Sequence, residues 1–104
     1  FYLDAIRHPN VLLPPADTID GDAWHLFVIR HPERDRLLAH LASRGVDAKI
    51  HYPIPPHHQT AYAAYRHLSL PITERIHREV LSLPLHPQLP DAEAEQVAEA
   101  VNKF

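Results

Sequence analysis

The sequence contains no cysteine, which excludes disulfide-stabilised folds, zinc sites with cysteine ligands and thiol catalysis. It also contains no methionine and begins at Phe1, so we expect it to be a piece of a longer protein. No apolar run is long enough to span a bilayer, and no signal-peptide pattern opens the chain. We therefore expect no membrane partner and a cytoplasmic location. The only two glycines, Gly21 and Gly45, stand apart, which excludes a glycine-rich phosphate loop.

Positive charge is also scarce. The formal net charge is -3, so the chain has no basic surface for a nucleic acid, and we expect no nucleic-acid partner. The length of 104 residues allows one domain, and shares of 45% hydrophobic and 22% charged residues are those of an ordinary globular domain. Histidine and proline, with ten and eleven residues, are the types in excess.

The first half of the chain predicts strand, helix and strand. Residues 23–30 are rich in aromatic and β-branched side chains on both faces, which predicts a central strand buried on two sides. Pro32 opens a helix with a leucine stripe, and Gly45 stands where a helix C-terminus favours glycine. Residues 46–52 alternate between apolar and polar, which predicts a second strand with one packed face.

The second half predicts a loop, two helices and a strand between them. Residues 53–60 contain three prolines and should form a stiff, extended loop. Pro71 starts a helix, residues 81–85 form a short strand, and Asp91 is the expected N-cap of the last helix. We therefore predict an α+β fold: a two-layer small domain with an approximately three-stranded sheet and helices packed on one face.

The densest polar cluster lies where the predicted second strand runs into the proline loop. It contains His51, Tyr52, His57, His58 and Gln59. A strand end followed by a rigid loop suits a binding site, because few backbone torsions separate the polar groups. A surface histidine is the alternative interpretation of His51.

Two other kinds of site are not expected. His57 and His58 are adjacent, and in an extended loop their rings would point in opposite directions, so we predict no metal site. Lys49 lies between Asp47 and His51 on a polar strand face, without the desolvated pocket that a Schiff-base lysine requires. The residues thus indicate a binding loop without a complete catalytic set.

Three stretches carry a family resemblance: Ala23-Trp24-His25-Leu26-Phe27-Val28-Ile29-Arg30, then His51-Tyr52-Pro53-Ile54-Pro55-x-His57-x-Gln59, then Leu81-Ser82-Leu83-Pro84-Leu85. They resemble the C-terminal part of the DegT/StrS-type sugar aminotransferases, which are pyridoxal-phosphate enzymes of the aspartate-aminotransferase fold. The resemblance covers nearly all of the chain from about Val11. Pro56 departs from it, because the family more often has leucine at that position.

The resemblance implies how the chain divides into segments and which domain would hold the cofactor and which the substrate. Residues 1–22 would connect from a missing large domain, and residues 23–104 would form the C-terminal small domain. The large domain would hold the aldimine lysine and most contacts to pyridoxal phosphate, so no catalytic residue is expected here. His51, Tyr52 and His57 would be the substrate-binding residues; the first two would line the sugar-nucleotide pocket, and the third would support the loop or a dimer contact.

The resemblance also implies the partners. The substrate would be a nucleotide-linked keto sugar, the amino donor glutamate, and the full-length protein a homodimer. The chain alone is expected to be inactive. Two alternatives stay open: a dehydratase of the same family, in which histidine replaces the aldimine lysine, and a stand-alone binding or regulatory module.

Overall fold

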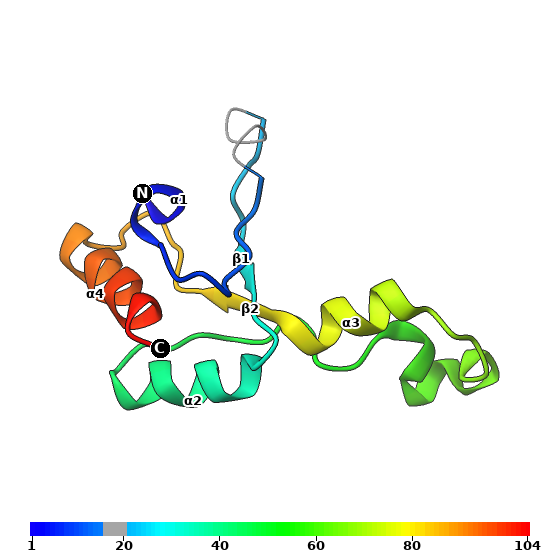
Figure 1. Cartoon of the computed structure of the whole chain (residues 1–104). Coiled ribbons are helices and arrows are strands. Elements are labelled where there is room, and N and C mark those ends of the chain that lie inside the picture. Colours follow the sequence, from blue (N-terminus) through cyan, green and yellow to red (C-terminus); the bar gives the residue numbers. More distant parts are fainter. Residues whose placement is uncertain (16–20) are drawn as a thin grey trace.

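A computed structural model describes residues 1–15 and 21–104. A body of helices and strands carries an arm that projects to one side, and the chain measures 47 × 33 × 26 Å (Figure 1). Both helices and strands are present, which confirms the predicted α+β class. The elements follow the order α1 (Tyr2–Ala5), β1 (Phe27–Arg30), α2 (Arg34–Ser43), η2 (Pro56–His58), η3 (Thr60–Tyr65), α3 (Pro71–Glu79), β2 (Val80–Leu83) and α4 (Asp91–Asn102), where η marks a 3₁₀ helix.

The sheet has two strands where about three were predicted. β1 and β2 pair antiparallel, with Phe27 opposite Leu83 and Arg30 opposite Val80. The predicted strand over residues 46–52 is reduced to one bridge, in which the backbone of Lys49 pairs with Ser82 on the free edge of β2. Leu12 makes a similar single bridge to Arg30 on the outer edge of β1. Two short strands with one-residue neighbours therefore replace the regular sheet.

The first strand is shorter than the apolar run predicted, and one of its faces is only half-buried. Trp24 has a positive φ of 45°, which interrupts the extended backbone, so β1 begins only at Phe27. Along the strand, Phe27 and Ile29 are buried while Val28 and Arg30 are half-buried. The prediction of a strand buried on two sides was therefore wrong.

Helix α2 ends as the sequence predicts. Gly45 follows the helix with φ 76°, a conformation that favours glycine because a side chain there is strained. The N–H of Val46 donates to the carbonyl of Leu41 and that of Gly45 to Ala42, the two hydrogen bonds of a Schellman motif. This turn sends the chain back along the sheet toward the proline loop.

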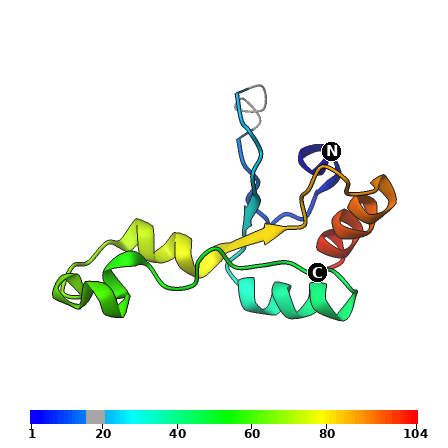
Figure 2. The same cartoon turned by 180° about the vertical axis from the view of Figure 1, so that it is seen from behind.

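The core lies between one face of the sheet and the helices of the body. Phe27, Ile29, Leu81 and Leu83 share that face, because directly paired residues point the same way. Helices α2 and α4 cover it, as the views from front and back show (Figures 1 and 2). The core also includes Leu37, Leu41, Val97, Val101, Tyr2 and Ile6. The first residues of the chain, expected only as a connector, thus pack into the same core.

The arm consists of η2, η3 and α3, and it lies away from this core (Figure 1). Ile72, in the first turn of α3, is 76% exposed. The buried guanidinium of Arg34 donates to the carbonyls of His77 and Val80, at 3.2 and 3.0 Å. These bonds satisfy carbonyls at the end of α3 and attach the arm to α2.

The N-cap of α4, the predicted domain boundary and the length of the helices are the remaining features of the fold. Helix α4 begins with Asp91 as its first residue, after Pro90 at the N-cap, so the predicted cap lies one residue too late. The domain boundary predicted after residue 22 follows residues 16–20, which lie outside the described part. Within residues 1–15 and 21–104, no helix combines the length and the hydropathy that crossing a bilayer requires.

Candidate functional site

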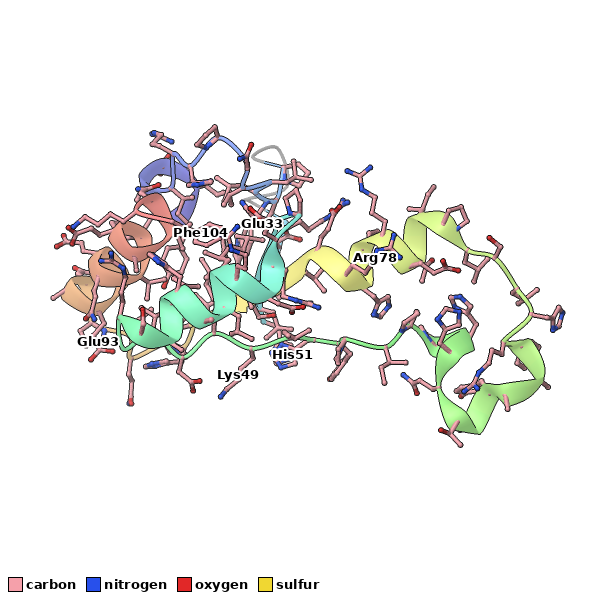
Figure 3. All side chains as sticks on the ribbon, turned by 60° about the horizontal axis from the view of Figure 1, so that its bottom comes forward. Glu33, Lys49, His51, Arg78, Glu93 and Phe104 are labelled. Carbon is pink, nitrogen blue, oxygen red and sulfur yellow. The ribbon has the colours of Figure 1, made fainter. Side chains whose placement is uncertain are left out.

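The site begins where the chain leaves the free edge of β2. Lys49 and His51 lie on this segment, between α2 and the arm (Figure 3). Nδ1 of the half-buried His51 is 2.9 Å from the hydroxyl of Ser82. Ser82 is buried in the middle of β2, on the face opposite the helices. The sheet therefore holds the imidazole of His51 in place through a buried hydroxyl.

Tyr52 is the exposed member of the pair. Its residue is 65% exposed, and its ring lies edge-on to that of His51 with centroids 5.3 Å apart. The peptide bond between the two residues is cis. The carbonyl of Tyr52 is 2.6 Å from Nδ1 of His77 on α3, so this nitrogen carries the proton and donates. The backbone is anchored while the phenol faces outward.

The proline loop turns back on itself at η2 and is attached to α3. The ring of His57 is buried, at 4% exposure, and its Nε2 lies 3.1 Å from Oε1 of Glu74. The same carboxylate oxygen accepts the N–H of Leu70 at 2.9 Å, ahead of α3. These contacts lower the pKa of Glu74, first through the Leu70 N–H and then through His57. An ionised carboxylate thus joins loop and helix.

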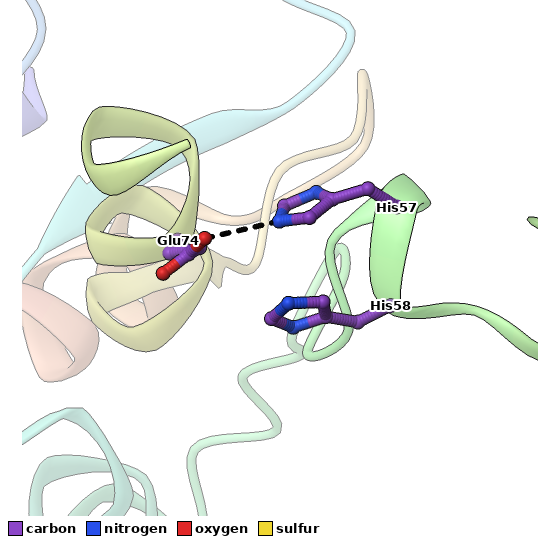
Figure 4. A group of neighbouring side chains, drawn as sticks. All are labelled: His57, His58 and Glu74. Carbon is purple, nitrogen blue, oxygen red and sulfur yellow. Dashed lines mark hydrogen bonds and ion pairs between the residues drawn. The ribbon is translucent and has the colours of Figure 1, made fainter. Parts of the chain in front are cut away.

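His57 and His58 do not point in opposite directions, which corrects the geometric reason given against a metal. Because residues 56–58 form a 3₁₀ turn and not an extended strand, the two ring centroids are only 4.1 Å apart. Both rings extend toward Glu74 on α3 (Figure 4). The burial of His57 favours its role as a support of the loop over direct contact with a substrate.

Neither lysine of the chain fits the aldimine role. Lys49 is largely exposed and lies 2.6 Å from a carboxylate oxygen of Asp47. Lys103 is also exposed and pairs with Glu99. A Schiff-base lysine requires a desolvated pocket, which a solvated, ion-paired ammonium lacks. Neither lysine therefore has the desolvated surroundings that an aldimine lysine requires.

The structure exposes Tyr52 at the surface and leaves the neighbouring His51 half-buried. It adds three supporting residues that the sequence analysis missed: Ser82, His77 and Glu74. Only Glu74 carried a local signal, as an acidic residue in the first turn of a predicted helix. Ser82 and His77 act across the fold, so no local pattern identifies them.

A family model and a curated relative both match this chain and point to the same family of proteins. The family model described as the DegT/DnrJ/EryC1/StrS aminotransferase family matches residues 3–102. The chain is 44% identical over 104 residues to the dTDP-3-amino-3,6-dideoxy-alpha-D-galactopyranose transaminase of Aneurinibacillus thermoaerophilus. That match covers 100% of this chain and 29% of the relative, so the chain spans under a third of the relative's length.

Two solved structures also match this chain and agree with the family match. The chain matches the Streptomyces venezuelae protein DesV, solved in complex with a ketimine intermediate, with a TM-score of 0.86 and 39% identity over 98% of this chain and 28% of that one. It also matches the Bacillus subtilis protein NtdA, solved with bound cofactor PMP, with a TM-score of 0.78 and 30% identity over 89% of this chain and 22% of that one. The fold is therefore that of part of an aminotransferase.

Proposed function

Because this chain belongs to the DegT/DnrJ/EryC1/StrS aminotransferase family, we propose that it forms the C-terminal small domain of a nucleotide-sugar aminotransferase. The complete protein transfers an amino group, from glutamate, to a keto carbon of a nucleotide-linked sugar. It works in the cytoplasm as a homodimer and uses pyridoxal phosphate. The observation that carries this proposal is the family match over residues 3–102, together with the exposed Tyr52 and the half-buried His51 beside it.

His51 and Tyr52 bind the nucleotide sugar in this proposal. A sugar diphosphate offers hydroxyls and phosphate oxygens, which require hydrogen-bonding groups on a fixed frame. The imidazole of His51 is oriented by Ser82 and can present Nε2 to such an oxygen. Tyr52 is anchored by its backbone and can present either a hydroxyl or an aromatic face. Both residues bind and orient the substrate, and neither removes a proton.

The cofactor is held outside this chain. Pyridoxal phosphate supplies the electron sink for amino transfer, and the lysine that it requires lies in the large domain. The ion-paired state of Lys49 and Lys103 supports this assignment. Mixing the isolated chain with pyridoxal phosphate should therefore give no saturable imine absorbance band. A band that Lys49→Ala abolishes would contradict it.

The decisive test uses the complete protein with pyridoxal phosphate, glutamate and a dTDP-linked 3-keto-6-deoxyhexose. Formation of the amino sugar, followed by mass spectrometry, is the expected result. His51→Ala should lower kcat/KM for the sugar by about tenfold or more, because a hydrogen bond to a charged or polar substrate group is lost. The cofactor absorbance spectrum should stay unchanged.

Three outcomes separate this proposal from its alternatives. Loss of a sugar hydroxyl without gain of nitrogen would identify a dehydratase, and no reaction with any nucleotide sugar would favour a binding module. An unchanged kcat/KM in the His51→Ala variant would remove that residue from the site, even if amino transfer itself is observed. The reaction and the role of His51 are thus tested separately.

A further inference from the structure

We propose that His57, His58 and Glu74 form a site for one divalent transition-metal ion, such as Zn²⁺. The bound ion would hold the η2 loop against α3. Each residue offers one ligand atom, and these atoms all lie within 4.8 Å of one another. The side chains come from two segments that are separated in sequence by η3 (Figure 4). This inference is independent of the function proposed above.

The ligand chemistry selects the class of ion. Two imidazole nitrogens and one carboxylate oxygen suit Zn²⁺, Ni²⁺ and Cu²⁺, whereas Mg²⁺ and Ca²⁺ prefer ligand sets made of oxygen. Three protein ligands leave one position of a tetrahedral ion for water. That water has space, because a hollow of about 310 Å³, lined by His58, Glu74 and Arg78 among others, opens beside the cluster.

The geometry requires only a small adjustment. Ligand atoms about 2.0–2.1 Å from a tetrahedral zinc lie roughly 3.3 Å apart, so the separations here must close by up to about 1.5 Å. His57 is already fixed by burial and by its 3.1 Å contact with Glu74. The partly exposed ring of His58 is 4.1 Å from that of His57 between centroids and can turn into place. Rotation of one side chain therefore completes the set.

The protonation states of the ligands permit metal binding but limit its affinity. A glutamate carboxylate is ionised at neutral pH, as a metal ligand must be. Binding at Nε2 of His57 moves the ring proton to Nδ1, which is buried and has no hydrogen-bond partner among the described residues. Metal-bound imidazoles usually donate this second proton to an acceptor. We therefore expect micromolar affinity, weaker than that of a zinc finger.

The test is calorimetric titration of the complete protein with ZnCl₂ and, separately, with NiCl₂. Wild type should contain one site that the His58→Ala and Glu74→Gln variants weaken by at least about tenfold. His67→Ala is the matched control, because it removes an imidazole from the same arm outside the cluster, and it should bind as wild type does. Glu74→Gln retains an oxygen that can accept the Leu70 N–H, so the start of α3 should persist.

The visible absorption of bound Co²⁺ gives a second readout, which distinguishes a four-coordinate site from single histidines elsewhere. Wild type should develop the visible absorption of a four-coordinate ion, and His58→Ala should not. Circular dichroism without metal should be the same for all four proteins. The proposal is overturned if wild type and His58→Ala titrate alike, or if His67→Ala loses as much affinity as the cluster variants. Since the ring of His58 is partly exposed, loss of fold does not explain its effect.

Discussion

The hydroxyl of Ser82 lies 2.9 Å from Nδ1 of His51 and connects a buried position of β2 to the candidate substrate surface. The two residues are 31 positions apart in sequence. They meet because the backbone of Lys49 pairs with Ser82 at the edge of the sheet. The hydrogen bond leaves Nε2 of His51 as the nitrogen that can face a ligand. The sheet thus orients a side chain that it does not itself contain.

Replacing Ser82 by alanine should therefore weaken sugar binding, although Ser82 acts through His51 and not through a contact of its own with the sugar. Without the hydroxyl, the ring of His51 loses its orientation, and kcat/KM for the nucleotide sugar should fall by about three- to tenfold. Steady-state kinetics of the complete protein measures this. The control is Ser43→Ala, which removes an exposed hydroxyl at the end of α2. Equal kinetics for Ser82→Ala and wild type would show that the bond does not position the imidazole.

The exposed phenol of Tyr52 can act through its hydroxyl or through its ring. Tyr52→Phe retains the ring, so kcat/KM should fall by about tenfold if the hydroxyl binds the sugar and should stay unchanged if stacking dominates. Tyr52→Leu removes both and should lower kcat/KM in either case. Because the backbone carbonyl of Tyr52, which His77 binds, is the same in both variants, the loop should stay anchored. No effect of Tyr52→Leu would place this residue outside the site.

The ion pair of Arg30 and Glu79 should stabilise the junction between sheet and arm. Nε and Nη2 of Arg30 both lie near one carboxylate oxygen of Glu79, at 3.1 and 2.7 Å, and the Glu79 side chain is only 14% exposed. The pKa of Glu79 is lowered, first by Arg75 and also by Arg30. Glu79→Gln should reduce the free energy of unfolding by about 1–3 kcal/mol, measured by urea denaturation.

The exposed pair of Glu33 and Arg36 is the matched control for this prediction. Glu33→Gln should change the free energy of unfolding by less than about 1 kcal/mol, because solvent and salt screen exposed pairs. Equal effects of the two substitutions would contradict the structural role given to Glu79.

Stability should fall in acid because of His31. The pKa of His31 is lowered from its ordinary value of 6.5, first by burial of the ring and second by the nearby His8. Since the unfolded state takes up this proton at a higher pH than the folded state does, the free energy of unfolding decreases as pH falls through 6.5. Thermal melts from about pH 7.5 to about pH 5 should show this loss.

His31→Asn isolates the contribution of that one ring. Nδ1 of His31 accepts the N–H of Glu33 at 3.0 Å, and an asparagine carboxamide oxygen can accept the same bond without titrating. The variant should therefore lose stability less steeply than wild type over the same pH range. Parallel melting curves for the two proteins would mean that other histidines carry the pH dependence.

Local sequence signals predicted helices α2, α3 and α4, but not α1 or the 3₁₀ turn η2, and they predicted the strands less well. Gly45 follows the end of α2 because glycine tolerates a positive φ, whereas Pro32 lies two residues before the first helical residue, Arg34. The apolar run of residues 23–30 predicted too long a strand, because the conformation of Trp24 is not visible in composition. The alternation of residues 46–52 predicted burial correctly at Val46 and Ala48 and wrongly at Tyr52, and the segment pairs at one residue only.

The sequence by itself determined which groups the candidate site contains: His51 and Tyr52 before the prolines, and two adjacent histidines after them. It also determined where the chain turns, because proline and glycine restrict backbone torsions whatever surrounds them. Only the tertiary structure decided which partners these groups meet. Ser82 orients His51, His77 anchors Tyr52 and Glu74 contacts His57, because these contacts depend on the pairing of β2 and the placement of α3. Hydrogen bonds and metal ligation require distances of a few ångströms between residues far apart in sequence, and packing alone sets those distances.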